Sequence, residues 1–230
     1  METVSFSGFT LETFRFFKEL MENNNKPWFE EHKAVYQKQV LEPLKALALA
    51  LTPPMHQVDP KMDFRPQKMI SRIYRDIRFS PDKTPYKRHM WLSFQRPFDK
   101  QTPDWETFPG FYMEVGEEGI NYGMGMWQAK KVIMDRYRDM VAYDTEGFRE
   151  MTEDLIYKHR FEMGGEEYKR PIKSDLPEYF QPWIQRKGIH LHKNYPTSGE
   201  YLYSDELVDF MVNEFILLKP LYEFFVDVCE

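Results

Sequence analysis

The middle of the chain alternates apolar and polar residues, and this alternation restricts the fold more than any other feature of the sequence. Four segments show it, at residues 69–79, 90–95, 111–115 and 120–126. A period of two residues is typical of half-buried antiparallel strands. The last two segments are joined by a short glycine-bounded turn at 116–119, which is typical of a hairpin. The block therefore predicts a mostly antiparallel sheet.

Helical periodicity precedes the strand block. Apolar residues recur every three or four positions over 10–23 and 28–51, which predicts two helices. Pro43 is expected to kink or divide the second helix, because proline supplies no N–H donor. The pair Pro53 and Pro54 predicts a firm end to that helix.

Helices return after the strand block. The same spacing predicts helices over 129–141 and 145–156. Residues 188–195 are expected to form one further strand. Ser204 is expected to open a C-terminal helix, which Pro220 should bend or split. Helices, then strands, then helices predict an α+β fold with a central sheet flanked by N-terminal and C-terminal helices.

Composition limits the class of protein. The 230 residues suit a single α+β domain over 1–230, and nineteen Phe, fourteen Tyr and five Trp are too many for a disordered chain. The only thiol, Cys229, excludes a disulfide framework. No apolar run approaches the roughly 18 residues that a membrane span needs. We therefore expect a cytoplasmic protein with no membrane partner.

Charge is distributed unevenly along the chain. Residues 61–100 hold eleven Lys or Arg and four Asp, a net charge of +7, although the whole chain carries −6. Such asymmetry usually marks a contact surface or pocket for an anionic partner. The alternative is that the basic stretch pairs with the acidic remainder of the chain. The negative total disfavours nucleic acid as a partner.

The densest group of charges spans residues 71–87. A turn at 80–82 would bring Lys83 and Lys87 back toward the arginines. Several cations near one point need paired carboxylates or a bound anion, and guanidinium forks match phosphate and carboxylate groups. We therefore expect a pocket for a phosphate, a nucleotide or a phosphoester. Its expected ligand-binding residues in this segment are Arg72, Arg75, Arg78, Lys83 and Lys87.

Three functions remain open for this segment. In an enzyme acting on an anionic small molecule, Asp76 would be the general base or orienting group and Tyr86 the acid. A non-catalytic module would dock an acidic protein or a nucleic acid, with aromatic residues such as Tyr74 beside the cations. In a purely structural network, Asp76 and Asp82 would neutralise the cations. Neither enzymatic activity, a cofactor nor the oligomeric state follows from the sequence.

Two other patterns bear on ligands. Gly123 and Gly125 share one strand face and leave a trough that a ligand or another backbone could approach, although helix packing is slightly favoured. Trp127 would wall a ligand trough. His190 and His192 share a strand face, but no further ligand motif accompanies them, so we expect no metal site.

The charged segment at 71–87 resembles the signature of a known family. The string Arg72-x-x-Arg75-Asp76-x-Arg78-Phe79-x-x-Asp82-Lys83-x-x-Tyr86 looks like that of a bacterial family, domain of unknown function 2461. Similar matches to the family are Asn24-Asn25-Lys26-x-Trp28-Phe29, Pro109-Gly110-Phe111-Tyr112 and Gly123-x-Gly125-x-Trp127. The resemblance covers essentially the whole chain.

The resemblance adds one candidate and shows two departures. It implies a role for Arg138, which falls where the family tends to have an arginine. The chain has Ala129 where a proline is usual and Glu114 where a histidine is frequent. Because the family has no assigned activity, the resemblance implies only that the Arg/Asp/Lys/Tyr set is a hallmark.

Overall fold

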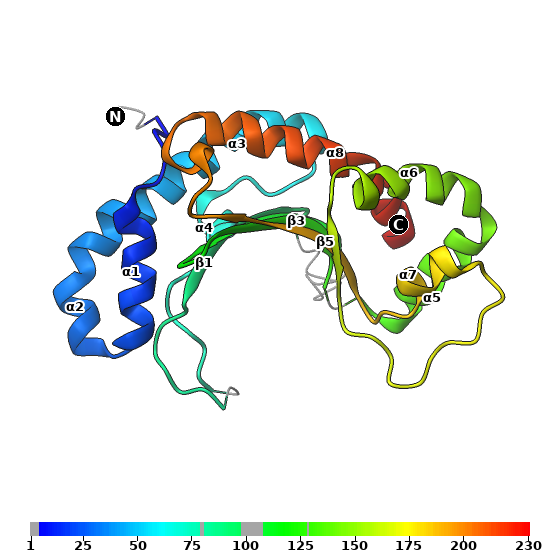
Figure 1. Cartoon of the computed structure of the whole chain (residues 1–230), viewed down its shortest axis with the longest axis horizontal. Helices are drawn as coiled ribbons and strands as arrows, with labels where there is room; N and C mark the ends of the chain where they lie inside the picture. Colours follow the sequence, from blue (N-terminus) through cyan, green and yellow to red (C-terminus); the bar gives the residue numbers. More distant parts are fainter. Residues whose placement is uncertain (1–4, 79–80, 98–107, 128) are drawn as a thin grey trace. The chain divides into compact units, whose positions relative to one another are not determined.

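The computed structural model divides into two compact units, each built from separate stretches of the chain (Figure 1). The described residues are 5–78, 81–97, 108–127 and 129–230. The first unit comprises Met1–Phe94, Tyr112–Tyr122 and Asn194–Glu214, and the second Gln95–Phe111, Gly123–Lys193 and Phe215–Glu230. Whether the chain forms a single domain stays a prediction.

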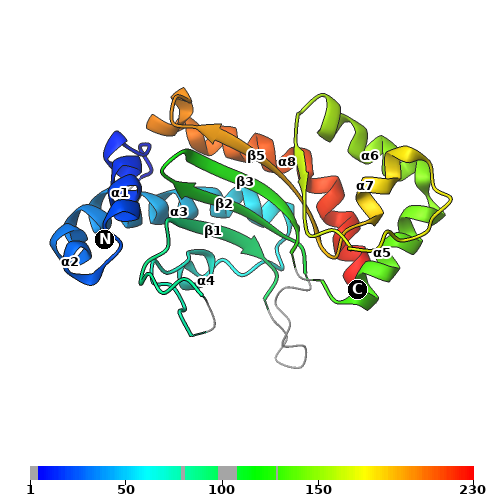
Figure 2. The same cartoon turned by 60° about the horizontal axis from the view of Figure 1, so that its bottom comes forward.

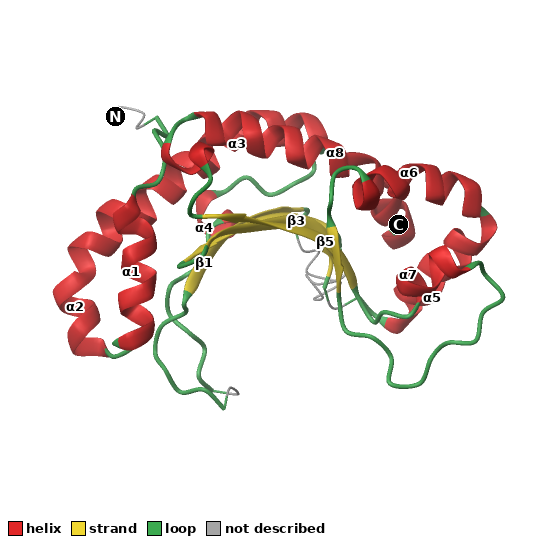
Figure 3. Ribbon diagram, in the orientation of Figure 1, coloured by secondary structure: helices red, strands yellow, loops and turns green. Residues whose placement is uncertain are grey.

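The predicted α+β fold is confirmed by the sheet and the helices around it (Figures 2 and 3). The strands are β1 (His89–Gln95), β2 (Gly110–Gly116), β3 (Gly119–Met126), β4 (Glu162–Gly164) and β5 (Ile189–Pro196). They form one antiparallel sheet in the order β1-β2-β3-β5-β4. The alternation at 90–95, 111–115 and 120–126 therefore predicted strands correctly, and the further strand expected at 188–195 is confirmed as β5.

The first unit contains the N-terminal helices. They are α1 (Leu11–Glu22), α2 (Lys26–Val35), a π-helical segment (Tyr36–Leu41), α3 (Glu42–Val58) and the single turn α4 (Pro66–Met69). Asn25 is the N-cap of α2, and its side-chain oxygen accepts a hydrogen bond from the Trp28 N–H at 3.1 Å. The helix predicted over 10–23 is confirmed as α1.

The prolines of the second predicted helix act differently from one another. Pro43 lies in the first turn of α3, where the π-helical segment changes to α-helix and the backbone stays helical without a break. The end predicted at Pro53 and Pro54 is wrong, because α3 continues to Val58. Leu51 and Met55 are both buried, so packing of the last turns outweighs the hydrogen bonds that two prolines cannot make.

The strand predicted over 69–79 is wrong, and Phe79 lies outside the described residues. The segment before Phe79 contacts the residues that follow the turn through an isolated bridge between Tyr74 and Tyr86. The Asp76 carboxylate accepts from the Arg78 N–H at 3.1 Å, and such local bonds compete with a strand ladder. The segment is therefore an irregular excursion before β1.

The second unit contains α5 (Lys131–Tyr143), α6 (Thr145–Tyr157) and the short α7 (Gln181–Ile184), and α8 (Glu206–Cys229) contributes to both units. Asp144 caps α6 by accepting from the Gly147 N–H at 2.9 Å. Pro220 does not split α8, which runs through it as one helix. Among the described residues, no helix has the length and apolar character needed to cross a membrane.

The sheet of the first unit has two unlike faces. Met90, Leu92 and Phe94 of β1 are fully buried, and α3 runs along one face of the sheet (Figure 1). The alternate residues of β1 and β2 are half-buried and include His89 and Glu114. One face therefore forms core, and the other carries polar side chains.

Candidate functional site

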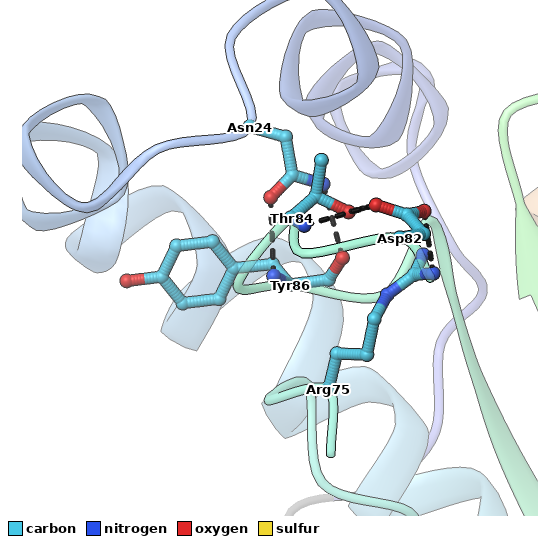
Figure 4. A network of polar contacts seen from close by, with 5 residues as sticks. All are labelled: Asn24, Arg75, Asp82, Thr84 and Tyr86. Carbon is cyan, nitrogen blue, oxygen red and sulfur yellow. Dashed lines mark hydrogen bonds and ion pairs between the residues drawn. The ribbon is translucent and has the colours of Figure 1, made fainter. Parts of the chain in front are cut away.

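The turn within the 71–87 segment is folded around Asp82 (Figure 4). One carboxylate oxygen accepts from the Thr84 N–H at 2.9 Å and from its hydroxyl at 2.8 Å. The other oxygen accepts from the Arg75 guanidinium at 2.6 Å. Asp82 therefore shapes the turn and fixes Arg75 at the same time.

A second group of contacts holds the same segment to the helices (Figure 4). The Asn24 side chain accepts from the Tyr86 N–H at 3.1 Å and donates to the Tyr86 carbonyl at 3.0 Å, as a paired strand would. The Tyr86 ring stacks on Phe29 with centroids 4.1 Å apart. Tyr86 is only 2% exposed, and burial raises its pKa. These contacts give Tyr86 a structural role and make it a poor acid.

The predicted cations gather around one cleft of about 360 Å³ in the first unit. Arg72, Arg75, Arg78 and Lys87 line it, together with Tyr74, Asp76 and Ile77. Lys83 does not line the cleft, and its ammonium donates to the Ile77 carbonyl at 2.8 Å. The sequence therefore predicted the grouping of four of these five cations.

The charges in this cleft are only partly balanced. Arg78 pairs with Asp76 at 2.6 Å, and its hydrogen bonds lower the pKa of Asp76 to about 2. A carboxylate with so low a pKa is a weak general base at neutral pH. Within the described part of the chain, Arg72 has no ion pair, and the buried Nε of Arg75 has no hydrogen-bond partner. Burial and the nearby Arg72 and Arg75 lower the pKa of Lys87.

Arg138 and Trp127 belong to the second unit and do not line the cationic cleft. Arg138 donates to the Ile184 and Arg186 carbonyls, each at 2.8 Å, and so ties α5 to the chain after α7. Trp127 stacks on His190 with centroids 5.8 Å apart. Neither contact needs a ligand.

The glycine trough is occupied by a neighbouring strand. A Cβ on Gly123 would lie 2.0 Å from the Leu191 carbonyl oxygen, and one on Gly125 would lie 2.3 Å from that of Ile189. The close approach is therefore that of the β5 backbone, and the slightly favoured helix packing is wrong. Among the described residues, no three His, Cys, Asp or Glu side chains are grouped to hold a metal ion.

A larger cleft of the first unit, about 600 Å³, was not predicted. Arg88, His89, Glu114 and Asn121 line it, at the polar face of β1, β2 and β3. Burial raises the pKa of Glu114 to about 7. The available signal was that His89 precedes the alternation at 90–95 and that Glu114 occupies a polar position of the alternation at 111–115.

We expect Glu114→Gln to stabilise the protein at pH 8 and to change its stability little at pH 5. The pKa of Glu114 rises from 4.5 to about 7 on folding, because burial disfavours the carboxylate. Below about pH 4.5 Glu114 is protonated in the folded and the unfolded chain, so its burial costs no stability. As the pH rises from there through the folded-state pKa of about 7, the free energy of unfolding falls. Thermal melting at both pH values measures this effect. The control is Glu31→Gln, which changes an exposed glutamate of α2. Equal differences between wild type and Glu114→Gln at both pH values would contradict the expectation.

A comparison with protein families gives a match over most of the chain. The model of a family described as "Conserved hypothetical protein (DUF2461)" matches residues 12–224. No curated protein matches the chain. The match supports the resemblance noted in the sequence and carries no activity with it.

Proposed function

The chain belongs to the DUF2461 family, and because that family assigns no activity, we propose from the site alone that the cationic cleft binds the anionic group of a small molecule. Arg72 and Lys87 would be the principal ligands, and Arg75, which also lines the cleft, would add positive charge. A phosphate monoester suits this set, since guanidinium and ammonium donors both recognise phosphate oxygens.

The observation that carries the proposal is the uncompensated positive charge. Four cations and one carboxylate, that of Asp76, line the cleft. Asp82 lies outside the lining and neutralises a second cation, Arg75. Two positive charges therefore remain, in a site that already lowers the pKa of Lys87. A bound anion would relieve this repulsion and would accept hydrogen bonds from the Arg72 guanidinium.

The size of the cleft favours a small ligand. A volume of about 360 Å³ lies near the lower limit for small-molecule sites. Tyr74 is 54% exposed in the wall and offers a ring for the organic part of the ligand. We place this binding in the cytoplasm of a bacterium, where a lone cysteine such as Cys229 stays reduced.

Arg72→Ala is expected to weaken the binding of inorganic phosphate at least about tenfold, because a charge-assisted hydrogen bond contributes about 1.5–3 kcal/mol. Isothermal titration calorimetry at low salt measures the affinity. Lys68→Ala is the matched control, since it removes one positive charge from the same basic stretch outside the cleft. Equal affinities for wild type and Arg72→Ala, or no saturable binding by wild type, would overturn the proposal.

A second candidate is a non-catalytic module for an acidic protein or nucleic acid. The exposed apolar side chains of Tyr74 and Ile77 beside the cations favour it. Binding to a single-stranded oligonucleotide would then weaken steeply with salt. A purely structural network explains the pairs of Arg75 with Asp82 and Arg78 with Asp76, but gives no role to Arg72.

A further inference from the structure

Glu114 and His89 face each other across two strands of the first unit. The His89 Nδ1 lies 3.3 Å from a Glu114 carboxylate oxygen, so either group can hold a shared proton. The two side chains are 34% and 40% exposed, and both line the cleft of about 600 Å³. The pair is thus open to a ligand yet partly removed from water.

Fixed polar groups continue from this pair along the sheet. The Tyr112 hydroxyl donates to the Asn121 side-chain oxygen at 2.5 Å, and the Asn121 amide donates to the Asn194 side chain at 2.8 Å. Asn121 and Asn194 both line the cleft. Their mutual bonds fix which amide atoms face a ligand, as positioned binding groups require.

The pair also adjoins the cationic cleft. Lys87 lines that cleft, and its ammonium lies 4.0 Å from the centroid of the Trp91 ring. His89 contacts the same ring, with centroids 5.7 Å apart. The pKa of His89 is lowered by burial and by the positive charges of Lys87 and Arg75. Lys87, Trp91 and His89 therefore connect the two clefts.

We infer that Glu114 is a general acid–base residue, positioned by His89, which exchanges a proton with a small molecule whose anionic group occupies the cationic cleft. This inference rests on the proposed function. The substrate class is a phosphomonoester with a C–H bond next to a carbonyl group, because the carbonyl makes that proton acidic enough for a carboxylate base. The C–H bond breaks, its proton passes to the Glu114 carboxylate, and the electron pair stays on the substrate as an enolate. Return of the proton to the same carbon restores the substrate, so the exchange needs no co-reactant.

The surroundings of Glu114 suit this role. A carboxyl group whose pKa is about 7 is present in both protonation states at neutral pH, which general acid–base catalysis needs. The titratable or charged residues that surround it or line the same cleft are Arg88, His89, Tyr112, Glu117, Glu118 and Tyr195. The raised pKa itself comes from burial.

Proton exchange in deuterated water tests the inference directly. Wild-type protein is incubated with a panel of carbonyl-bearing phosphomonoesters, including dihydroxyacetone phosphate, and loss of C–H signals is followed by proton NMR. Exchange should occur with at least one compound and increase with pH through about 7. Glu114→Gln should slow it by at least about 100-fold, while its affinity for inorganic phosphate stays within about twofold of wild type.

Two variants complete the test. His89→Gln should shift the midpoint of the pH profile, which a merely structural role would not do, and Glu31→Gln should exchange at the wild-type rate. No exchange with any compound, or unchanged exchange by Glu114→Gln, overturns the acid–base role while phosphate binding remains intact. Failure of the wild-type protein to bind inorganic phosphate would instead overturn the proposed function.

Discussion

Gly123→Ala is expected to lower the free energy of unfolding by about 3 kcal/mol or more. The added Cβ would lie 2.0 Å from the Leu191 carbonyl oxygen and 2.9 Å from the His192 Cα, so it collides with backbone atoms of β5. Backbone within a paired sheet cannot move aside as a flexible side chain can, and β3 and β5 would have to separate. The change acts on the interior of the second unit.

Gly116→Ala is the matched control for this effect. Its added Cβ would meet the Arg88 carbonyl oxygen and the His89 Cβ at 3.5 Å, an ordinary contact. Thermal melting should show a fall of roughly 6–12 °C for Gly123→Ala and little change for Gly116→Ala. A Gly123→Ala protein as stable as wild type would mean that β5 does not approach β3 this closely, and would reopen the trough as a ligand site.

The strands could be predicted where burial alone decides the structure. Residues 90–95 alternate because Met90, Leu92 and Phe94 face the core, and hydropathy reports this directly. The 69–79 segment alternates too, but side-chain hydrogen bonds decide its path. Hydropathy does not record that the Asp76 carboxylate binds the Arg78 N–H, so the same pattern gave a wrong strand.

The candidate site could be predicted in its membership but not in its pairing. The basic stretch placed Arg72, Arg75 and Lys87 together, because a turn returns the chain on itself. The choice of Asp82 as the partner of Arg75 depends on the geometry of that turn. The contact of His89 with Glu114 depends on strand register, which neither strand's own sequence contains.

Phe29→Ala is expected to lower the free energy of unfolding by about 3–5 kcal/mol. Phe29 is 1% exposed, stacks on Tyr86 and contacts the rings of Phe16 and Tyr36. Its removal leaves a cavity where α2 meets the segment that carries the cationic cleft. Most of the cost is lost apolar contact with the rings of Phe16, Tyr36 and Tyr86, together with the cavity left between them.

Denaturant unfolding of Phe29→Ala measures this cost, and Tyr143→Ala is its control. Tyr143 is 93% exposed, so removing an aromatic ring there should change the free energy of unfolding by less than about 0.5 kcal/mol. The Asn24 hydrogen bonds to the Tyr86 backbone remain in Phe29→Ala, so phosphate should still bind the folded fraction, with weaker affinity. Wild-type stability of Phe29→Ala would show that Asn24 alone holds this segment to the helices, and that the aromatic cluster does not position the cleft.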